Sequence, residues 1–241
     1  MANLTQLKML ENLDGFLLVD KPTGIAFSTV VKTVKRKFNL IKVGHGGSLD
    51  AMASGLLVVL IGDANKFVAD VMGADRTYTG TMRLGRKTST HDIYGETLSE
   101  ATTLAGLDIP AALAKHLPEF KGDLFQTEPR FCSVRKEGSA AYEVADTGDH
   151  AQFLTHVYRL QTAVAEGNRV SFEVLASKSL LVRTLVNDLG DALGCGACLE
   201  TLRRTKIGKF TVDAAIPFDR ILETEMKDFA SCVMPLSAAW R

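Results

Sequence analysis

The stretch Val43-Gly-His-Gly-Gly-Ser-Leu-Asp-Ala-Met-Ala-Ser-Gly-Leu-Leu57 joins a glycine-rich loop to the start of an apolar run. The apolar run continues through residues 56–61 and predicts a buried strand. The loop before it carries one carboxylate, Asp50, five residues after His45. Such a carboxylate can be a nucleophile, a general base or a structural cap. From the loop alone, a structural aspartate in a turn is the commoner case.

Regular elements are predicted on both sides of this loop. Residues 16–20 indicate a buried strand, which a Lys-Pro-Thr-Gly turn ends at residues 21–24. Ser28 is a candidate N-cap for a helix whose apolar positions recur at helical spacing as far as Phe38. Further helices are predicted over 65–72, 110–117 and 181–193, and further strands over 77–84, 157–165 and 169–176. Strands and helices are interspersed without strict βαβ alternation, which favours a mixed α+β architecture over a doubly wound sheet.

Composition is that of an ordinary globular protein. The 241 residues are 46% hydrophobic and 23% charged, which excludes collagen-like and disordered classes. Lys+Arg and Asp+Glu both number 28, so the formal net charge is zero. An evenly spread zero balance argues against a nucleic-acid partner.

The charge is unevenly spread, however. Residues 21–49 hold six basic residues and no acidic one, and residues 101–150 hold eight acidic against five basic residues. A second basic cluster comprises Arg203, Arg204, Lys206 and Lys209. A basic run is most often a solvated face, but a local patch can still bind phosphates.

Several other classes of protein are disfavoured. The sequence has no GxxxxGK(S/T), GxSxG, HExxH or EF-hand pattern. It has no apolar signal segment or membrane-spanning run, so we expect a cytoplasmic protein with no membrane partner. Cys195 and Cys198 form a CxxC, which is compatible with redox chemistry or half a zinc site. No second ligand pair is present, which favours small buried thiols over a metal site.

The motifs, taken together and in order, resemble the TruB family of tRNA pseudouridine synthases. The central stretch is similar to the family's GHTGSLDPLATGLL, and the resemblance extends from about Leu13 to Leu236. The other matching motifs are Gly15-Phe-Leu-Leu-Val-Asp-Lys-Pro-Thr-Gly24, Arg76-Thr-Tyr78, Leu84-Gly-Arg-Lys-Thr-Ser-Thr-His-Asp-Ile-Tyr-Gly95, the segment from Ser177 to Ala197, Leu202-Arg203-Arg204 and Gly208-Lys-Phe210. The resemblance implies a pseudouridine synthase catalytic fold, with a mixed, mostly antiparallel central sheet flanked by helices and loops.

The resemblance also implies a reaction and its catalytic residues. The N-glycosidic bond of a uridine breaks and the base is reattached through carbon five, with Asp50 as the catalytic aspartate. Whether Asp50 attacks the ribose carbon or the uracil ring stays open. By position, Arg183 pairs with that aspartate, Tyr78 stacks on the target base, and Leu202 lines the base pocket. No cofactor or metal is implied, because the reaction is redox-neutral and involves no hydrolysis.

Other positions are implied to bind RNA. His45 corresponds to a residue that occupies space vacated by flipped bases, a role we favour over general-base catalysis. Lys21 is expected to be a turn residue close to the catalytic loop. An RNA-clamping insertion is expected at about 126–150, with the candidate phosphate contacts Arg130, Arg135 and Lys136.

The chain departs from the family pattern at four positions. Gly46 and Ala51 stand where Thr and Pro are usual, which predicts a looser catalytic loop. Leu181 replaces an aromatic residue, and Cys198 replaces a histidine, which accounts for the CxxC. The expected organisation is a single catalytic domain over residues 1–241, without the PUA-type domain of many relatives.

The sequence therefore predicts a tRNA pseudouridine synthase, by resemblance for uridine 55 of the T arm, that binds the T stem-loop as a monomer. Two rivals stay open. One is a non-catalytic RNA-binding protein or tRNA folding chaperone that retains the fold, and the other is a thiol-redox or zinc protein. Without a global positive field, RNA binding is expected to depend only weakly on salt.

Overall fold

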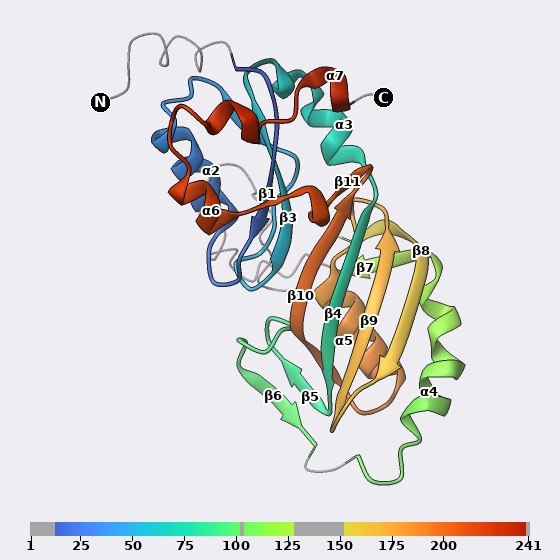
Figure 1. The fold of residues 1–241 in the computed structure, drawn as a ribbon. Helices are drawn as coiled ribbons and strands as arrows, with labels where there is room; N and C mark the ends of the chain where they lie inside the picture. Colours follow the sequence, from blue (N-terminus) through green and yellow to red (C-terminus); the bar gives the residue numbers. More distant parts are fainter. Residues whose placement is uncertain (1–12, 102–103, 128–151, 240–241) are drawn as a thin grey trace. The chain divides into compact units, whose positions relative to one another are not determined.

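The structure is a computed structural model, and it describes residues 13–101, 104–127 and 152–239 (Figure 1). The chain forms two compact units, and each is described by itself. Unit 1 comprises the described residues up to Ala74 and from Arg203 on, and unit 2 comprises Asp75–Leu202. Strand β10 (Ala197–Ile207) contributes residues to both units.

Unit 1 is built around the strand β3 (Ser54–Ile61). Strand β1 (Gly15–Lys21) runs antiparallel along one edge of β3, and β2 (Val43–His45) runs antiparallel along the other. The end of β10 continues this second edge in parallel, with Arg203 opposite Ser54. The remaining short strands are β11 (Phe210–Thr211), antiparallel to β10, and β12 (Ile216–Pro217), parallel to β1.

Helices bury both faces of this sheet. Leu17 and Val19 of β1 pack into one apolar cluster together with residues of helices α2 and α6, whereas Phe16 and Leu18 pack into a second cluster with Val71 of α3. Burial on both faces explains why the strands are continuous apolar runs rather than alternating ones. The helical segments are α2 (Phe27–Lys37), η1 (Gly62–Phe67), α3 (Val68–Gly73), η3 (Val212–Ala214), α6 (Phe218–Glu223), η4 (Phe229–Cys232) and α7 (Leu236–Ala239).

The start of α2 differs from the prediction. Its N-cap is Ala26, which makes no side-chain cap hydrogen bond, and Ser28 lies inside the first turn. The helix begins earlier because Phe27 packs against the core cluster of unit 1 and against the ring of His45. Packing of an aromatic side chain outweighs a single capping hydrogen bond.

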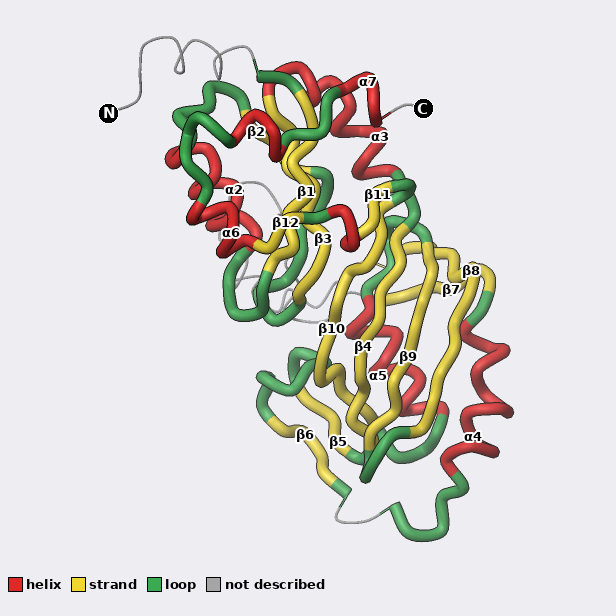
Figure 2. Tube along the Cα trace, in the orientation of Figure 1, coloured by secondary structure: helices red, strands yellow, loops and turns green. Residues whose placement is uncertain are grey.

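In the sheet of unit 2 the strands β4, β9, β8 and β7 follow one another, each antiparallel to the next, and β10 lies beside β4 at its other edge. Figure 2 shows helix α5 covering one face of it, while α4 contacts β8. A separate two-stranded sheet pairs β5 with β6. The elements are β4 (Arg76–Leu84), β5 (Arg86–Thr88), β6 (Thr97–Glu100), α4 (Ile109–His116), η2 (Leu117–Phe120), β7 (Gly122–Thr127), β8 (Gln152–Val164), β9 (Arg169–Ala176) and α5 (Val182–Ala192).

These pairings confirm the predicted α+β class with a mixed, mostly antiparallel sheet. Parallel pairs occur at β1–β12 and at β10–β3, whereas the pairs β1–β3, β2–β3, β10–β11, β4–β9, β8–β9, β7–β8 and β5–β6 are antiparallel. The described part of the chain contains no helix long and apolar enough to span a membrane.

Candidate active site

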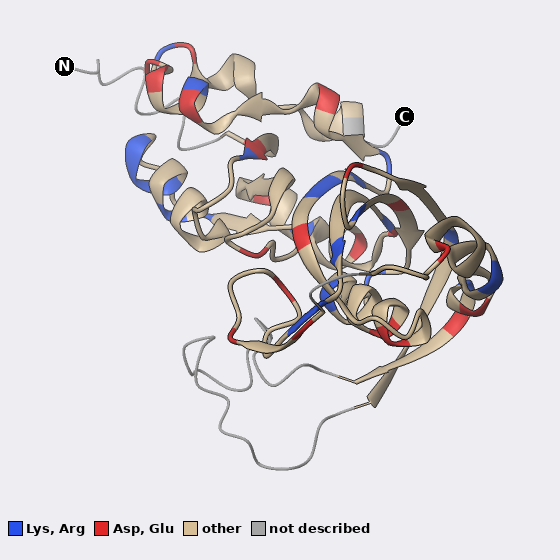
Figure 3. Ribbon diagram, turned by 90° about the horizontal axis from the view of Figure 1, so that it is seen from below, with Lys and Arg blue, Asp and Glu red and all other residues tan. Residues whose placement is uncertain are grey.

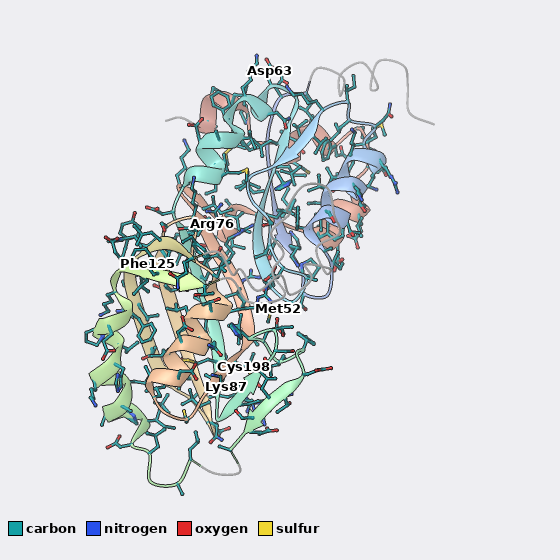
Figure 4. All side chains as sticks on the ribbon, turned by 180° about the vertical axis from the view of Figure 1, so that it is seen from behind. Met52, Asp63, Arg76, Lys87, Phe125 and Cys198 are labelled. Carbon is teal, nitrogen blue, oxygen red and sulfur yellow. The ribbon has the colours of Figure 1, made fainter. Side chains whose placement is uncertain are left out.

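Asp50 lies between β2 and β3, in residues 46–53, which we call the Asp50 loop. The first amide of the loop, that of Gly46, donates to the carbonyl oxygen of Val58 on β3 at 2.8 Å. Met52, labelled in Figure 4, marks the position of the loop. The loop is therefore attached directly to the strand that follows it.

Arg204 of β10 holds the backbone of this loop. Its side chain is 1% exposed, and it donates to the carbonyl oxygens of Ser48 at 2.7 Å, Gly47 at 3.3 Å and Leu56 at 2.8 Å. A buried guanidinium is tolerated only when its donors are satisfied, and here the acceptors are backbone groups on both sides of Asp50. Arg204 thus fixes the chain that carries the candidate nucleophile.

Two glycines permit this close packing. Gly55 has φ +103°, and a Cβ atom there would lie 2.3 Å from the carbonyl oxygen of Arg204, so only glycine fits between β3 and β10. A Cβ atom at Gly46 would lie 2.3 Å from Cγ1 of Val71. The space where relatives are expected to carry threonine is therefore filled by Val71, so the predicted looseness of the loop at this position finds no support.

Lys21 lies beneath the Asp50 loop and is fully buried. Its ammonium group donates to the carbonyl oxygens of Pro22 and Ile25, both at 2.8 Å, and of Ala51 at 3.4 Å. Burial lowers the pKa of Lys21 to about 8, and the negative charge of Asp50 opposes this shift. The structure thus places Lys21 close to the Asp50 loop, where it links the loop to the turn after β1.

His45 is the last residue of β2, directly before the Asp50 loop. Its ring contacts that of Phe27 edge-on, with centroids 4.8 Å apart, and its Nδ1 accepts from the amide of Gly47 at 3.3 Å. An accepting Nδ1 implies that a neutral ring carries its proton on Nε2. The ring is half-buried and keeps part of its surface accessible.

Unit 2 positions the other predicted residues. Tyr78 lies on β4 opposite Val174 of β9 and is 8% exposed. Leu202 lies on β10 and is 7% exposed. Both side chains are buried and lie on strands of the sheet.

Arg183 is the second residue of α5 and contacts the turn formed by residues 88–95, which we call the Asp92 turn. Its Nη1 donates to the carbonyl oxygen of Thr90 at 3.1 Å and to Oδ2 of Asp92 at 3.4 Å. The other carboxylate oxygen of Asp92 accepts from the Thr90 hydroxyl at 2.7 Å and from the Tyr94 amide at 3.0 Å. The guanidinium is therefore oriented by a carboxylate whose own position is fixed.

Two residues that contribute to this geometry were quoted within motifs but not selected as site residues. Asp92 is the aspartate of the LGxxTxTxDxxG pattern, and Arg204 ends the Leu-Arg-Arg motif. The sequence offered one signal for these two residues. Each is a charged side chain within a motif that is otherwise expected to be buried. The predicted phosphate contacts Arg130, Arg135 and Lys136 lie outside the described residues.

Neither thiol of the CxxC has the properties of a reactive cysteine. Cys198, labelled in Figure 4, is fully buried and Cys195 is partly buried, and burial raises the pKa of both thiols. Among the described residues there is no group of three or more His, Cys, Asp or Glu side chains that could hold a metal ion.

Positive charge gathers on helix α2 of unit 1. Lys32, Lys35 and Arg36 are exposed, and the last turn of the helix carries Lys35, Arg36 and Lys37; Figure 3 colours the ribbon blue at Lys and Arg residues. The basic run of residues 21–49 is thus a solvated helix surface, the exposed Lys42 and one buried lysine, Lys21.

The side chains of the candidate site are suited to particular chemical roles. A carboxylate on a fixed loop can act as a nucleophile toward an electrophilic carbon, and an oriented guanidinium can bind an anionic oxygen in bidentate geometry. A buried tyrosine supplies a ring face for stacking and a hydroxyl for proton transfer.

Comparison with known proteins finds matches over nearly the whole chain. The family model described as the N-terminal domain of TruB family pseudouridylate synthase matches residues 35–182, and that of the tRNA pseudouridylate synthase B C-terminal domain matches residues 183–240. A Burkholderia lata protein named tRNA pseudouridine synthase B is 36% identical over 229 residues, which cover 94% of this chain and 70% of that protein. A protein of the same name from Burkholderia pseudomallei (strain 668) is 38% identical over 212 residues, covering 87% and 69%.

A solved structure shows the same fold. The chain matches a protein in the crystal structure of a Cbf5-Nop10-Gar1 complex with a TM-score of 0.69 and 25% sequence identity. The match covers 97% of this chain and 63% of that protein.

Proposed function

The chain belongs to the TruB family of pseudouridylate synthases, and from this premise we propose that it converts uridine 55 in the T arm of tRNA to pseudouridine, with Asp50 as nucleophile. The family match confirms the predicted activity, the isomerisation of uridine in tRNA, and hence an RNA substrate. The assignment of each residue below is our proposal.

The observation that carries the proposal is the attachment of the Asp50 loop. Arg204 binds backbone carbonyls on both sides of Asp50, and Lys21 binds the carbonyl of the next residue. Holding a nucleophile in one geometry removes much of the entropic barrier to attack. A purely structural aspartate would not need such fixation of its own loop.

The reaction balances without a cofactor. The bond from ribose carbon 1′ to N1 of the uracil breaks, and a bond from carbon 1′ to carbon 5 of the same base forms. The hydrogen on carbon 5 leaves as a proton, and N1 takes up a proton. A covalent bond to the Asp50 carboxylate, to the ribose or to the ring, divides this exchange into two easier steps.

The other residues receive supporting roles. Tyr78 stacks on the extruded uracil, Leu202 lines the base pocket, and Arg183 pairs with the catalytic carboxylate. His45 occupies the gap left in the RNA when the base flips out, an event that costs a few kcal/mol of stacking. Arg130, Arg135 and Lys136 are proposed to contact RNA phosphates.

The substrate and the assembly state are likewise proposals. We expect the T stem-loop to be recognised through its shape and phosphates, by a monomer, and in the cytoplasm. The rival function, a non-catalytic RNA-binding protein or folding chaperone, is not favoured, because the matched relatives are named synthases and Asp50, Tyr78 and Arg183 are all present.

Tritium release from tRNA transcripts labelled at uridine carbon 5 tests the proposal. The native protein should release one tritium per tRNA, Asp50→Asn should release none while binding RNA, and Asp70→Asn, an exposed carboxylate on α3, should match the native protein. A transcript with cytidine at position 55 should release none. Absence of turnover by the native protein would support the non-catalytic rival, and equal turnover by Asp50→Asn would exclude Asp50 as nucleophile.

A further inference from the structure

His91 occupies the apex of the Asp92 turn, and its backbone is fixed on both sides. Its amide donates to the carbonyl oxygen of Thr88 at 3.2 Å, and its carbonyl oxygen accepts from the amide of Leu199 at 2.9 Å. Its φ is +61°, the left-handed region that few residues other than glycine adopt. Histidine, asparagine and aspartate tolerate this region better than most side chains.

This left-handed residue determines how Arg183 is held. Thr90 precedes His91 and Asp92 follows it, and the Thr90 carbonyl and the Asp92 carboxylate both bind the same guanidinium nitrogen, at 3.1 and 3.4 Å. A reversal of chain direction at residue 91 brings these two acceptors to one point.

The imidazole of His91 lies among charged groups. Arg183 and Asp191 reach it from α5, Lys87 from β5, and Asp92 from its own turn. Its Nδ1 is completely buried and has no hydrogen-bond partner. In a neutral ring with its proton on Nε2, Nδ1 is only an acceptor without a partner. In a protonated ring, Nδ1 would instead be a buried N–H donor without a partner.

The charges around the ring oppose its protonation. Lys87 forms an ion pair with Asp191 at 2.6 Å, which occupies the carboxylate that could otherwise stabilise an imidazolium. Burial, Arg183 and Lys87 lower the pKa of His91 below its ordinary value, against smaller opposing contributions from Asp191 and Asp92.

We propose that His91 is a positioning residue for Arg183, whose neutral imidazole keeps the guanidinium on Thr90 and Asp92 and whose protonation releases it. The inference rests on the proposed function, because Arg183 matters only if the site is catalytic. A protonated ring adds a cation beside Arg183 and competes for the carboxylate of Asp92. Acid then lowers the rate of isomerisation, and RNA binding is unchanged.

Single-turnover rates and tRNA dissociation constants from pH 5 to 8 test this role. In the native protein the rate should fall about tenfold per pH unit below the pKa of His91, at constant tRNA affinity. His91→Asn tolerates the left-handed turn and cannot titrate, so it should retain the rate at pH 8 and lose this acid limb. His91→Ala should be slower at every pH, and His116→Asn, on α4, should behave like the native protein. An unchanged acid limb in His91→Asn would overturn the proposal.

Nitrogen-15 NMR titration of the imidazoles gives an independent readout. The chain has five histidines, so each can be assigned by substitution. The expected result is an Nε2-protonated ring with a pKa below 6.5, raised by Lys87→Met and equal to the midpoint of the kinetic limb. A His91 pKa at or above 6.5 would refute the inference even if turnover is normal. Absence of turnover by the native protein would instead refute the proposed function, whatever the NMR titration shows.

Discussion

Arg183 and Asp92 form an ion pair in which Nη1 and Oδ2 are 3.4 Å apart and the side chains are 13% and 10% exposed. The pair joins the first turn of α5 to the Asp92 turn of the same unit. Because Asp92 also accepts from Thr90 and Tyr94, its carboxylate is fixed before it binds the arginine. Orientation of Arg183 therefore depends on a residue that need not touch the substrate.

Asp92→Asn should lower kcat about 10- to 100-fold, since a charge-assisted hydrogen bond contributes about 1.5–3 kcal/mol. The amide oxygen can still accept from Thr90 and Tyr94, so Asp92→Asn should lower the free energy of unfolding only through the lost ion pair with Arg183. Asp92→Ala removes those acceptors too and should also lower the free energy of unfolding by about 1–3 kcal/mol. Tritium release and urea denaturation measure the two effects. A native kcat in both variants would show that the ion pair does not orient Arg183.

Arg204→Ala should be the most damaging change in unit 1 that leaves Asp50 in place. Three backbone carbonyls lose their donor, two of them in buried hydrogen bonds, so we expect a loss of about 3–5 kcal/mol in the free energy of unfolding. We also expect a fall in kcat of about 100-fold, because the Asp50 loop loses its fixed geometry. Millimolar guanidinium should restore part of the rate by entering the vacated site, and the same concentration of urea should not.

Arg203→Ala is the matched control for that variant. The neighbouring Arg203 side chain is 39% exposed and pairs with Asp20, so its loss should cost at most about 1 kcal/mol. If Arg204→Ala has the native kcat, the hydrogen bonds to the loop are only structural.

Lys21 makes stability depend on pH in the alkaline range. Its pKa is lowered to about 8, whereas a lysine in an unfolded chain titrates near 10.4. Between these values the unfolded chain binds more protons than the native protein, so the free energy of unfolding should rise with pH in that window. Urea midpoints from pH 7.5 to 10 should show this rise, and Lys21→Met should remove it.

Lys66→Met serves as the control. The exposed ion pair with Asp63 raises the pKa of Lys66, so its contribution to stability is lost only at higher pH and has the opposite sign. The rise should therefore persist in Lys66→Met. Equal pH profiles in the native protein and Lys21→Met would contradict the assignment.

The parts of the fold that were predictable are those whose signal is local. The apolar run of residues 56–61 and the amphipathic segment of residues 181–193 correspond to β3 and α5. Strand β10 was not predicted, because its segment Ala197–Ile207 carries several charged residues, one of which, Arg204, becomes buried. Arg204 is stable there only because backbone carbonyls that are distant in the sequence accept hydrogen bonds from its guanidinium. The periodicity of apolar residues in the sequence does not indicate such partners.

The residues of the candidate site were also predictable only in part. Asp50, Tyr78 and Arg183 could be named from motifs, since each is a reactive residue type at a matching position. Asp92 and Arg204 act through other residues, so their importance becomes visible only with the hydrogen bonds they make. The β5–β6 pair was not predicted, because the exposed strand β6 has no apolar face.

Gly46 offers a direct test of how the Asp50 loop is packed. A Cβ atom there would lie 2.3 Å from Cγ1 of Val71 and 3.3 Å from Cβ of Val58. Gly46→Thr, which introduces the residue expected in relatives, should therefore lower the free energy of unfolding by about 1–3 kcal/mol through overpacking. Val71→Ala alone should cost about 2 kcal/mol through the cavity it leaves.

In the double variant the threonine enters the space that Val71 vacates. The combined loss should therefore be smaller than the sum of the two single losses, by about 1–2 kcal/mol. Urea denaturation of the four proteins measures this coupling, and kcat should recover with stability because Gly46 leads into the loop that carries Asp50. Additive losses would mean that Val71 does not fill the space beside Gly46, and the loop would then be looser than the packing indicates.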